Sequence, residues 1–181
     1  MGKLTDAVKH LILLNVVFFV ASSIVGPKLT AWFALFFPES PNFGVWQFLT
    51  HMFMHGGLMH ILFNMYALWA FGSPLEQMWG RNKFLFFYFS AGIGAGLIYT
   101  AVNYYQFNGI YNELVSLGMP GPEIQKILES GRYNTSILEK VSEERLVEMY
   151  QIYNTPAVGA SGAIYGCLLY TSDAADECVN V

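Results

Sequence analysis

Three long stretches of this chain contain no charged residue, and they constrain its fold more than any other feature of the sequence. Asp, Glu, Lys and Arg are absent from residues 11–27, 40–75 and 84–112. A helix that crosses a bilayer needs about 20 predominantly apolar residues. Charged residues make up only 12% of the chain, against about 25% in an average soluble domain. The sequence therefore predicts a membrane protein; the alternative, a soluble protein with very apolar core helices, rarely produces stretches of this length.

The expected fold is an all-α, polytopic transmembrane helical bundle. We expect its membrane-spanning helices at about 9–25, 57–73, 84–103 and 157–171. The last of these has only about 15 residues before Asp173, Asp176 and Glu177, which is too short to cross comfortably. A cleaved signal peptide is an alternative for the first stretch, but no clear small-residue cleavage site follows it.

Basic residues near the ends of the spans predict the orientation of the chain. Lys3 and Lys9 lie at the start of the first span, and Arg81 and Lys83 lie in the short link before the third. Short segments rich in Lys and Arg stay in the cytoplasm. We therefore expect a cytoplasmic N-terminus.

Two connecting segments differ in character. Residues 26–56 are rich in Phe and Trp, which predicts a loop lying in the membrane interface, broken into short pieces by Pro27, Pro38 and Pro41. Residues 104–156 contain seven glutamates and four basic residues. This polar insert is expected to form two helices, one starting after Pro122 and one at about 142–152 with Ser142 as its cap.

Polar residues inside the expected spans are the candidates for function, because such residues are costly at membrane depth. His60 and Asn64 are four residues apart and share one helix face. Both can donate hydrogen bonds, although such residues also join membrane helices without any catalytic role. His51, His55 and His60 could instead bind a metal ion, but no Cys, Asp or Glu lies nearby to complete a ligand set.

The motif Gly159-Ala160-Ser161-Gly162 opens the fourth apolar run. A serine in the first turn of a helix lies beside unpaired backbone N–H groups, which favour a developing negative charge. Serine needs a nearby base to become a nucleophile. By itself the motif equally fits helix packing, since Gly162 and Gly166 have the small-residue spacing common in membrane helices.

Taken together, residues 46–65 and 159–166 resemble the rhomboid intramembrane serine proteases, in the family's order and on the expected spans. The resemblance implies a bundle of six core spans that cleaves transmembrane substrates near the membrane face, without a metal or organic cofactor. It implies that Ser161 is the nucleophile and that His60 and Asn64 belong to the oxyanion hole. It further implies that Gly162 and Tyr165 support the catalytic histidine, and that Glu76 is structural.

The chain departs from the family's pattern at two places. Gln47 stands where the family often has arginine, and no histidine follows His60, although the family's base is a histidine on the sixth span. We expect an incomplete bundle, with about four of six core spans, which would be inactive alone. Residues 167–181 resemble a translated sequencing adapter, so we expect this tail, including Cys167 and Cys178, to be non-native.

The resulting hypothesis is an intramembrane serine endopeptidase acting on transmembrane proteins in a lipid bilayer, in a bacterial inner membrane. The alternative is a rhomboid-like membrane protein that binds transmembrane clients without cutting them. Nothing in the sequence indicates a channel, a transporter or a nucleic-acid partner. Substrate identity, the role of the insert and the oligomeric state stay open.

Overall fold

The computed structural model describes residues 3–179, and side chains for residues 3–171. Within this part the chain is helical throughout, apart from turns and one isolated antiparallel bridge between Leu35 and Ala157. The chain divides into two compact units. Unit 1 contains Met1–Leu35, Gly44–Leu97 and Ala157–Val181, and unit 2 contains Phe36–Phe43 and Ile98–Pro156.

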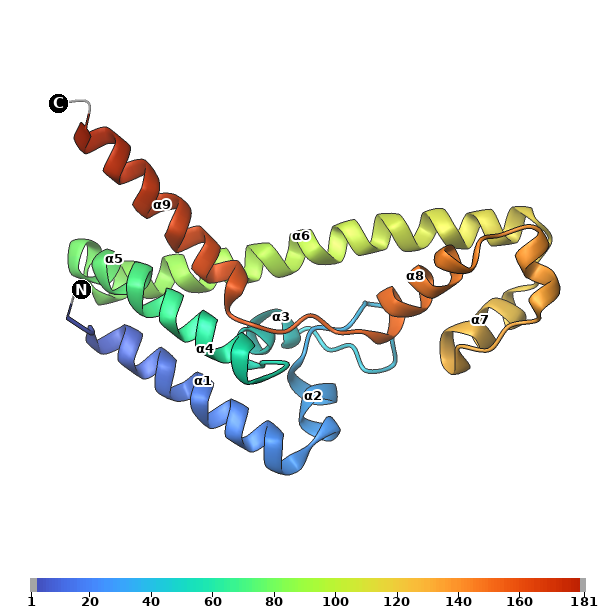
Figure 1. The fold of residues 1–181 in the computed structure, drawn as a ribbon, viewed down its shortest axis with the longest axis horizontal. Coiled ribbons are helices and arrows are strands. Elements are labelled where there is room, and N and C mark those ends of the chain that lie inside the picture. Colours follow the sequence, from blue (N-terminus) through green and yellow to red (C-terminus); the bar gives the residue numbers. More distant parts are fainter. Residues whose placement is uncertain (1–2, 180–181) are drawn as a thin grey trace. The chain divides into compact units, whose positions relative to one another are not determined.

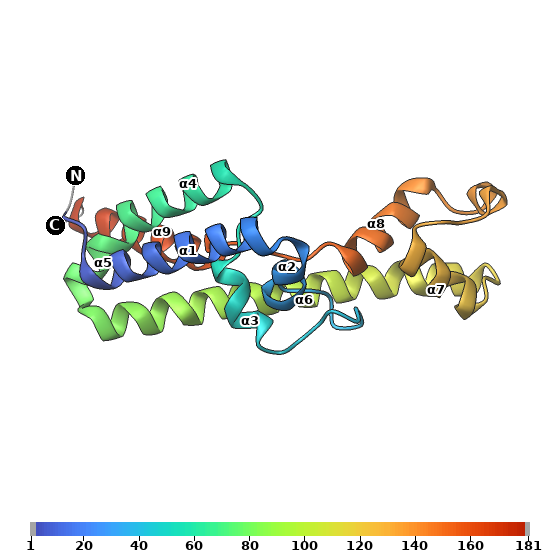
Figure 2. The same cartoon turned by 90° about the horizontal axis from the view of Figure 1, so that it is seen from below.

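Unit 1 is a bundle built around four helical segments. They are α1 (Asp6–Val25), the run α4 (Leu58–Ala67) to α5 (Ser73–Trp79), the first part of α6 (Arg81–Ser116), and α9 (Ser161–Val179). Helix α1 packs along α4 and α5, and α9 packs against α4 and the turn that follows it (Figure 1, Figure 2). The all-helical bundle expected from the sequence is confirmed.

The core of unit 1 comes from residues far apart in sequence. Its most buried members are apolar side chains of α1, of the α4–α5 run, of α6 and of α9, namely Val8, Leu11, Leu68, Leu75, Phe84, Tyr88, Ala160, Ala163 and Ile164. The same helices expose many large apolar side chains on their other faces, including Leu13, Val17, Phe63 and Phe86. A helix that is apolar all round suits a lipid environment. The chain is an integral membrane protein.

Two helices of the described part, α1 and α6, are long and apolar enough to cross a membrane as uninterrupted α-helices. The expected span at 57–73 corresponds to the α4–α5 run, which a π-helical turn at Leu68–Gly72 interrupts. Pro74 follows this turn and has no N–H to donate to the preceding carbonyls, so local rearrangement of the backbone bonds is expected there.

Two helices have other bounds than the membrane spans expected from the sequence. Helix α6 does not end near residue 103 but continues to Ser116, because Phe107, Ile110 and Leu114 give residues 104–116 an apolar face that is buried in unit 2. The fourth apolar run does not begin as a helix at residue 157. Residues 157–160 form the bridge and a turn, and α9 begins at Ser161 and extends to Val179.

The segment 26–56 holds short helices rather than an open loop. They are α2 (Pro27–Phe33), α3 (Gln47–Thr50) and a 3₁₀ turn at His51–Phe53. Pro27 does not only separate pieces but also starts α2, since the first helical position needs no N–H donor. Residues 36–43 of this segment belong to unit 2.

Unit 2 is a small helical unit with its own core. It contains the end of α6, α7 (Gly121–Ser130), a 3₁₀ turn at Thr135–Glu139 and α8 (Glu143–Asn154), so both expected helices of the insert are present. Ser142 occupies the N-cap position of α8, but its side chain makes no capping hydrogen bond. The core includes Phe37, Phe107, Ile110, Leu114, Ile124, Ile127, Leu146 and Met149.

Candidate active site

Ser161 is placed by a turn that the backbone fixes at three points. Ala157 exchanges hydrogen bonds with Leu35, at 2.8 and 3.0 Å, and the Gly159 N–H donates to the His51 carbonyl at 2.9 Å. Gly159 has φ +118°, a conformation that side-chain-bearing residues rarely adopt. Ser161 follows this turn as the first residue of α9, where backbone N–H groups have no partner within the helix.

His60 and Asn64 lie one turn apart on α4, next to this turn. The Asn64 amide Nδ2 donates to the His60 carbonyl at 3.0 Å, and the Asn64 side chain is buried. A β-carbon built on Gly159 would lie 2.8 Å from Nε2 of His60 and 3.7 Å from Nδ2 of Asn64. The polar ends of both side chains therefore face the backbone two residues before Ser161.

One cavity of about 320 Å³ is lined by all three predicted residues. His60, Asn64 and Ser161 line it together with apolar side chains of α4, the π turn and α9, namely Phe63, Ala67, Phe71, Ile164, Tyr165 and Leu168. Such a largely apolar pocket can hold an apolar segment, and three polar residues lie in its wall.

The hydrogen bonds of His60 indicate which ring nitrogen carries its proton. The Gly56 N–H donates to Nδ1 of His60 at 3.4 Å, so Nδ1 acts as an acceptor. In a neutral imidazole the other nitrogen then bears the hydrogen. Nε2, which faces Gly159, is therefore a hydrogen-bond donor.

The other two predicted residues of α9 occupy different faces. A β-carbon on Gly162 would lie 2.5 Å from Cβ of Ala95 on α6, and one on Gly166 would lie 2.9 Å from Cβ of Ala91. Gly162 thus lets two helices approach closely, and any support that it gives the site acts through this packing. Tyr165 lines the cavity with Ser161 and is 65% exposed.

Sequence comparison decides the family. The family model of the Rhomboid domain matches residues 42–175, which include every residue described above for the cavity. This chain belongs to the rhomboid family.

Individual relatives match a shorter region. The chain is 39% identical over 71 residues to Rhomboid protease GlpG of Salmonella paratyphi A and of Salmonella typhi, and 38% identical to that of Salmonella newport. The matched region is 39% of this chain and 26% of each relative. The chain therefore aligns with about a quarter of the length of these curated relatives.

Two further histidines of this rhomboid sequence, His51 and His55, are buried near the site. Nδ1 of His51 donates to the Gln47 carbonyl at 2.8 Å, and burial lowers the pKa of His51. His55 is buried beside His60, with ring centroids 5.1 Å apart. In the part of the chain that the structure describes, no three His, Cys, Asp or Glu side chains are grouped to hold a metal ion.

Gln47 occupies the position where the rhomboid pattern often has arginine. Its side chain is fully buried, and its Nε2 donates to the Ala31 carbonyl at 3.2 Å. Trp46 donates from Nε1 to the Trp32 carbonyl at 2.8 Å. Together these bonds tie α3 to the end of α2, so Gln47 performs a local structural task with an uncharged side chain.

Glu76 anchors the first helix of the bundle. Its Oε1 accepts from the Ala7 N–H at 2.9 Å and its Oε2 from the Val8 N–H at 3.0 Å, so one carboxylate satisfies two unpaired donors of α1. Burial opposes the charge, but the hydrogen bonds from the Ala7 and Val8 N–H groups and the charge of Arg81 outweigh it and lower the pKa of Glu76. The role is structural, as the resemblance implies.

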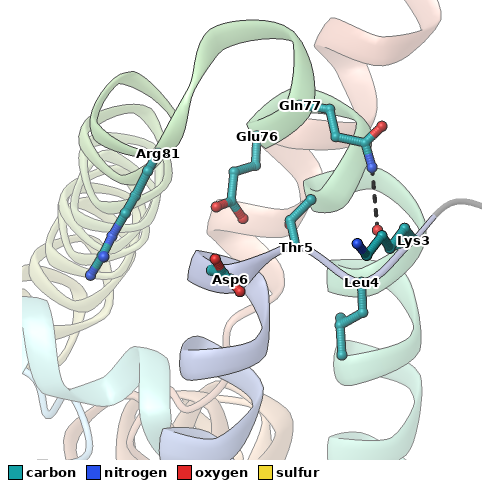
Figure 3. A pocket seen from close by; sticks show the side chains of 7 residues that line it. All are labelled: Lys3, Leu4, Thr5, Asp6, Glu76, Gln77 and Arg81. Carbon is teal, nitrogen blue, oxygen red and sulfur yellow. Dashed lines mark hydrogen bonds between the residues drawn. The ribbon is translucent and has the colours of Figure 1, made fainter.

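Glu76 lies beside a second, more open pocket of unit 1, of about 420 Å³. Figure 3 shows the Glu76 carboxylate directed toward the start of α1, while Gln77 is bonded to the Lys3 carbonyl at 3.2 Å. The lining residues are Lys3, Leu4, Thr5, Asp6, Glu76, Gln77 and Arg81. None of the predicted catalytic residues lines it.

Proposed function

We propose that this chain carries the nucleophile and the oxyanion hole of an intramembrane serine protease that cleaves transmembrane proteins near the membrane face. The observation that carries the proposal is the convergence of Ser161, His60 and Asn64 on one otherwise apolar cavity of about 320 Å³. Family membership and the similarity to proteins named Rhomboid protease GlpG support it.

Each of the three residues has a distinct task in this mechanism. The Ser161 Oγ attacks a peptide carbonyl of the substrate, and the oxygen that becomes negative is held by hydrogen bonds. The donors are Nε2–H of His60, the Nδ2–H of Asn64 that is not used on the His60 carbonyl, and the backbone N–H of Ser161. Each such donor contributes about 10²–10³ in rate.

The general base is a histidine other than the four of this sequence. In the tautomer that the Gly56 hydrogen bond indicates, His60 cannot accept the serine proton, because Nδ1 accepts from Gly56 and Nε2 bears a hydrogen. His51 lies against Gly96, where a β-carbon would be 3.2 Å from Cε1 of His51. His10 is hydrogen-bonded to the Asp6 carbonyl in the first turn of α1. His55 is buried edge-on to His60 and does not line the cavity of Ser161. We therefore propose a Ser-His dyad whose histidine approaches the exposed side of Tyr165.

The reaction then follows acyl transfer. The base removes the Ser161 proton and returns it to the leaving amine when the tetrahedral intermediate collapses. Water next attacks the acyl-enzyme, gives a proton to the same base and releases the carboxylate product, after which Ser161 regains its proton. No step of this proposed reaction uses a metal ion or an organic cofactor.

The apolar lining of the cavity fits the proposed substrate class. Phe63, Phe71, Ile164 and Leu168 offer contacts to an unwound segment of a membrane helix, whose side chains are themselves apolar. We propose that the protein acts in a bacterial inner membrane with its N-terminus in the cytoplasm, since Lys3 and Lys9 lie near the start of α1 and Arg81 and Lys83 near the start of α6.

A serine-directed fluorophosphonate probe tests the proposal. A longer natural protein that contains these residues and a further histidine span should be labelled, and Ser161→Ala should abolish labelling. Ser90→Ala is the matched control, because Ser90 is an exposed serine bonded to the Phe86 carbonyl. The 181-residue chain alone should be neither labelled nor active. A longer protein that folds but resists the probe would instead support the non-catalytic, client-binding alternative.

A further inference from the structure

His55 is a buried polar residue that the proposed mechanism does not use. Only 6% of its surface is exposed, and neither ring nitrogen makes a hydrogen bond of good geometry within the described residues. Burying polar atoms without such bonds costs free energy. An apolar side chain would fill the same space at lower cost, so the presence of an aromatic ring there needs a reason.

The ring of His55 lies edge-on to the ring of His60. The centroids are 5.1 Å apart and the ring planes make an angle of 66°. Edge-to-face contacts between rings are directional, and they restrict rotation of both partners. The next residue, Gly56, donates its N–H to Nδ1 of His60. His55 therefore restricts the plane of the His60 ring, and Gly56 makes Nδ1 of His60 a hydrogen-bond acceptor.

On its opposite side, the His60 ring contacts the turn that precedes Ser161. Nε2 faces Gly159, where a β-carbon would lie 2.8 Å away. Rotation of the ring by half a turn would exchange the positions of nitrogen and carbon atoms, and would move the donor away from the oxyanion position. The orientation of this ring therefore decides whether His60 can donate to a reacting carbonyl.

We propose that His55 is a positioning residue: its flat ring holds His60 so that Nδ1 stays on the Gly56 N–H and Nε2–H is directed at the oxyanion. This inference rests on the proposed function and deepens it. The determinant is the planar ring of His55, not its nitrogens.

The charge state of His55 agrees with this role. Burial is the main cause that lowers the pKa of His55 to about 4, a positive charge on His60 would act in the same direction, and the Phe53 carbonyl opposes the shift. His55 is therefore neutral at neutral pH. A neutral neighbour neither repels a donor hydrogen on His60 nor competes for the developing negative charge.

Imidazole nitrogen NMR of the 181-residue chain tests the inference without requiring catalysis. The chain is labelled with ¹⁵N-histidine in detergent micelles, and two-bond proton–nitrogen spectra report the tautomer of each ring. His51 serves as an internal reference, because its Nδ1 donates to a carbonyl and must bear the hydrogen. We expect opposite tautomers for His51 and His60 in the wild-type chain.

Three substitutions separate ring positioning from space filling. His55→Phe should preserve the single Nε2–H tautomer of His60, whereas His55→Leu and His55→Ala should give a mixture of both tautomers with His51 unchanged. Equal spectra for the Phe and Leu variants, or a wild-type His60 with hydrogen on Nδ1, would overturn the inference. It would also be overturned if the Leu and Ala variants both lost the His51 signal, since His55 would then be a core-packing residue.

Failure of this inference and failure of the proposed function give different results. If fluorophosphonate labelling succeeds but His60 does not respond to changes at His55, only the positioning role is wrong. If the tautomers behave as expected but the longer protein resists the probe, the geometry is real and the protease assignment is wrong.

Discussion

Gly159 and His60 are in direct contact across about 100 residues of sequence: a β-carbon on Gly159 would lie 2.8 Å from Nε2 of His60. Gly159 also has φ +118° and donates its N–H to the His51 carbonyl at 2.9 Å. The glycine therefore satisfies a conformational requirement and a steric requirement at once, and it links the turn before Ser161 to both His51 and His60.

Gly159→Ala should therefore destabilise the site. The positive φ alone costs a side-chain-bearing residue about 1–3 kcal/mol, and the methyl group must displace His60. We expect a fall of several degrees in the thermal unfolding midpoint in detergent, at about 2–4 °C per kcal/mol. Gly57→Ala is the control, because Gly57 has φ 175° and open space around its Cα. Equal midpoints for both variants would mean that the contact is not made.

The packing of α9 on α6 can be tested by exchanging the small residues at the contact between Gly162 and Ala95. Gly162→Ala alone should destabilise the bundle by about 1–3 kcal/mol, because its methyl group would lie 2.5 Å from Cβ of Ala95. Combining it with Ala95→Gly should restore part of this loss, and chemical unfolding of all four variants gives the coupling energy. Gly94→Ala, in open space, should be nearly neutral. Strictly additive effects would contradict a direct contact.

Glu76 should make stability depend on pH in a defined direction. Its pKa in the folded protein is lowered, so its contribution is present above the ordinary glutamate value, about 4.3, and is lost as the pH falls through the folded-state value. Glu76→Gln keeps one acceptor oxygen and loses the charge at the start of α1.

Thermal unfolding from pH 7 downwards measures this effect. At pH 7, Glu76→Gln should lower the free energy of unfolding by about 1–2 kcal/mol, and its unfolding midpoint by about 2–4 °C per kcal/mol. The difference from the wild type should shrink as acid protonates Glu76. Glu39→Gln, at an exposed position, is the matched control. A difference that stays constant or grows under acid would contradict the carboxylate anchor.

The helices of the bundle were predictable because membrane spans leave a compositional signal. Uncharged stretches located α1, the α4–α5 run and α6, but composition misplaced the end of α6. Residues 104–116 are polar enough to resemble a loop, yet Phe107, Ile110 and Leu114 recur at helical spacing and are buried in unit 2. Periodicity, rather than mean polarity, carried the relevant information there.

The site was predictable only in part. Motif resemblance named Ser161, His60 and Asn64, and the cavity brings all three together. The sequence did not predict the backbone hydrogen bond from Gly159 to His51 or the ring contact between His55 and His60. Both depend on how separate segments pack, which no local sequence pattern shows. From the sequence, His55 is a candidate only as a metal ligand. The residue type alone does not show whether a histidine acts through its ring nitrogens or through the packing of its ring.

Unit 2 should unfold independently of the candidate active site, because it has a core of its own. Ile127 on α7 is 1% exposed, so Ile127→Ala should cost about 2–5 kcal/mol through lost burial and the cavity left behind. Amide hydrogen exchange should accelerate in α7 and α8 but not in α1 or α4. Val147→Ala, at a position of α8 that is 41% exposed, should leave exchange nearly unchanged. Faster exchange in α4 as well would mean that the insert and the candidate site fold as one cooperative unit, and that substitutions in residues 104–156 can act on the turn before Ser161.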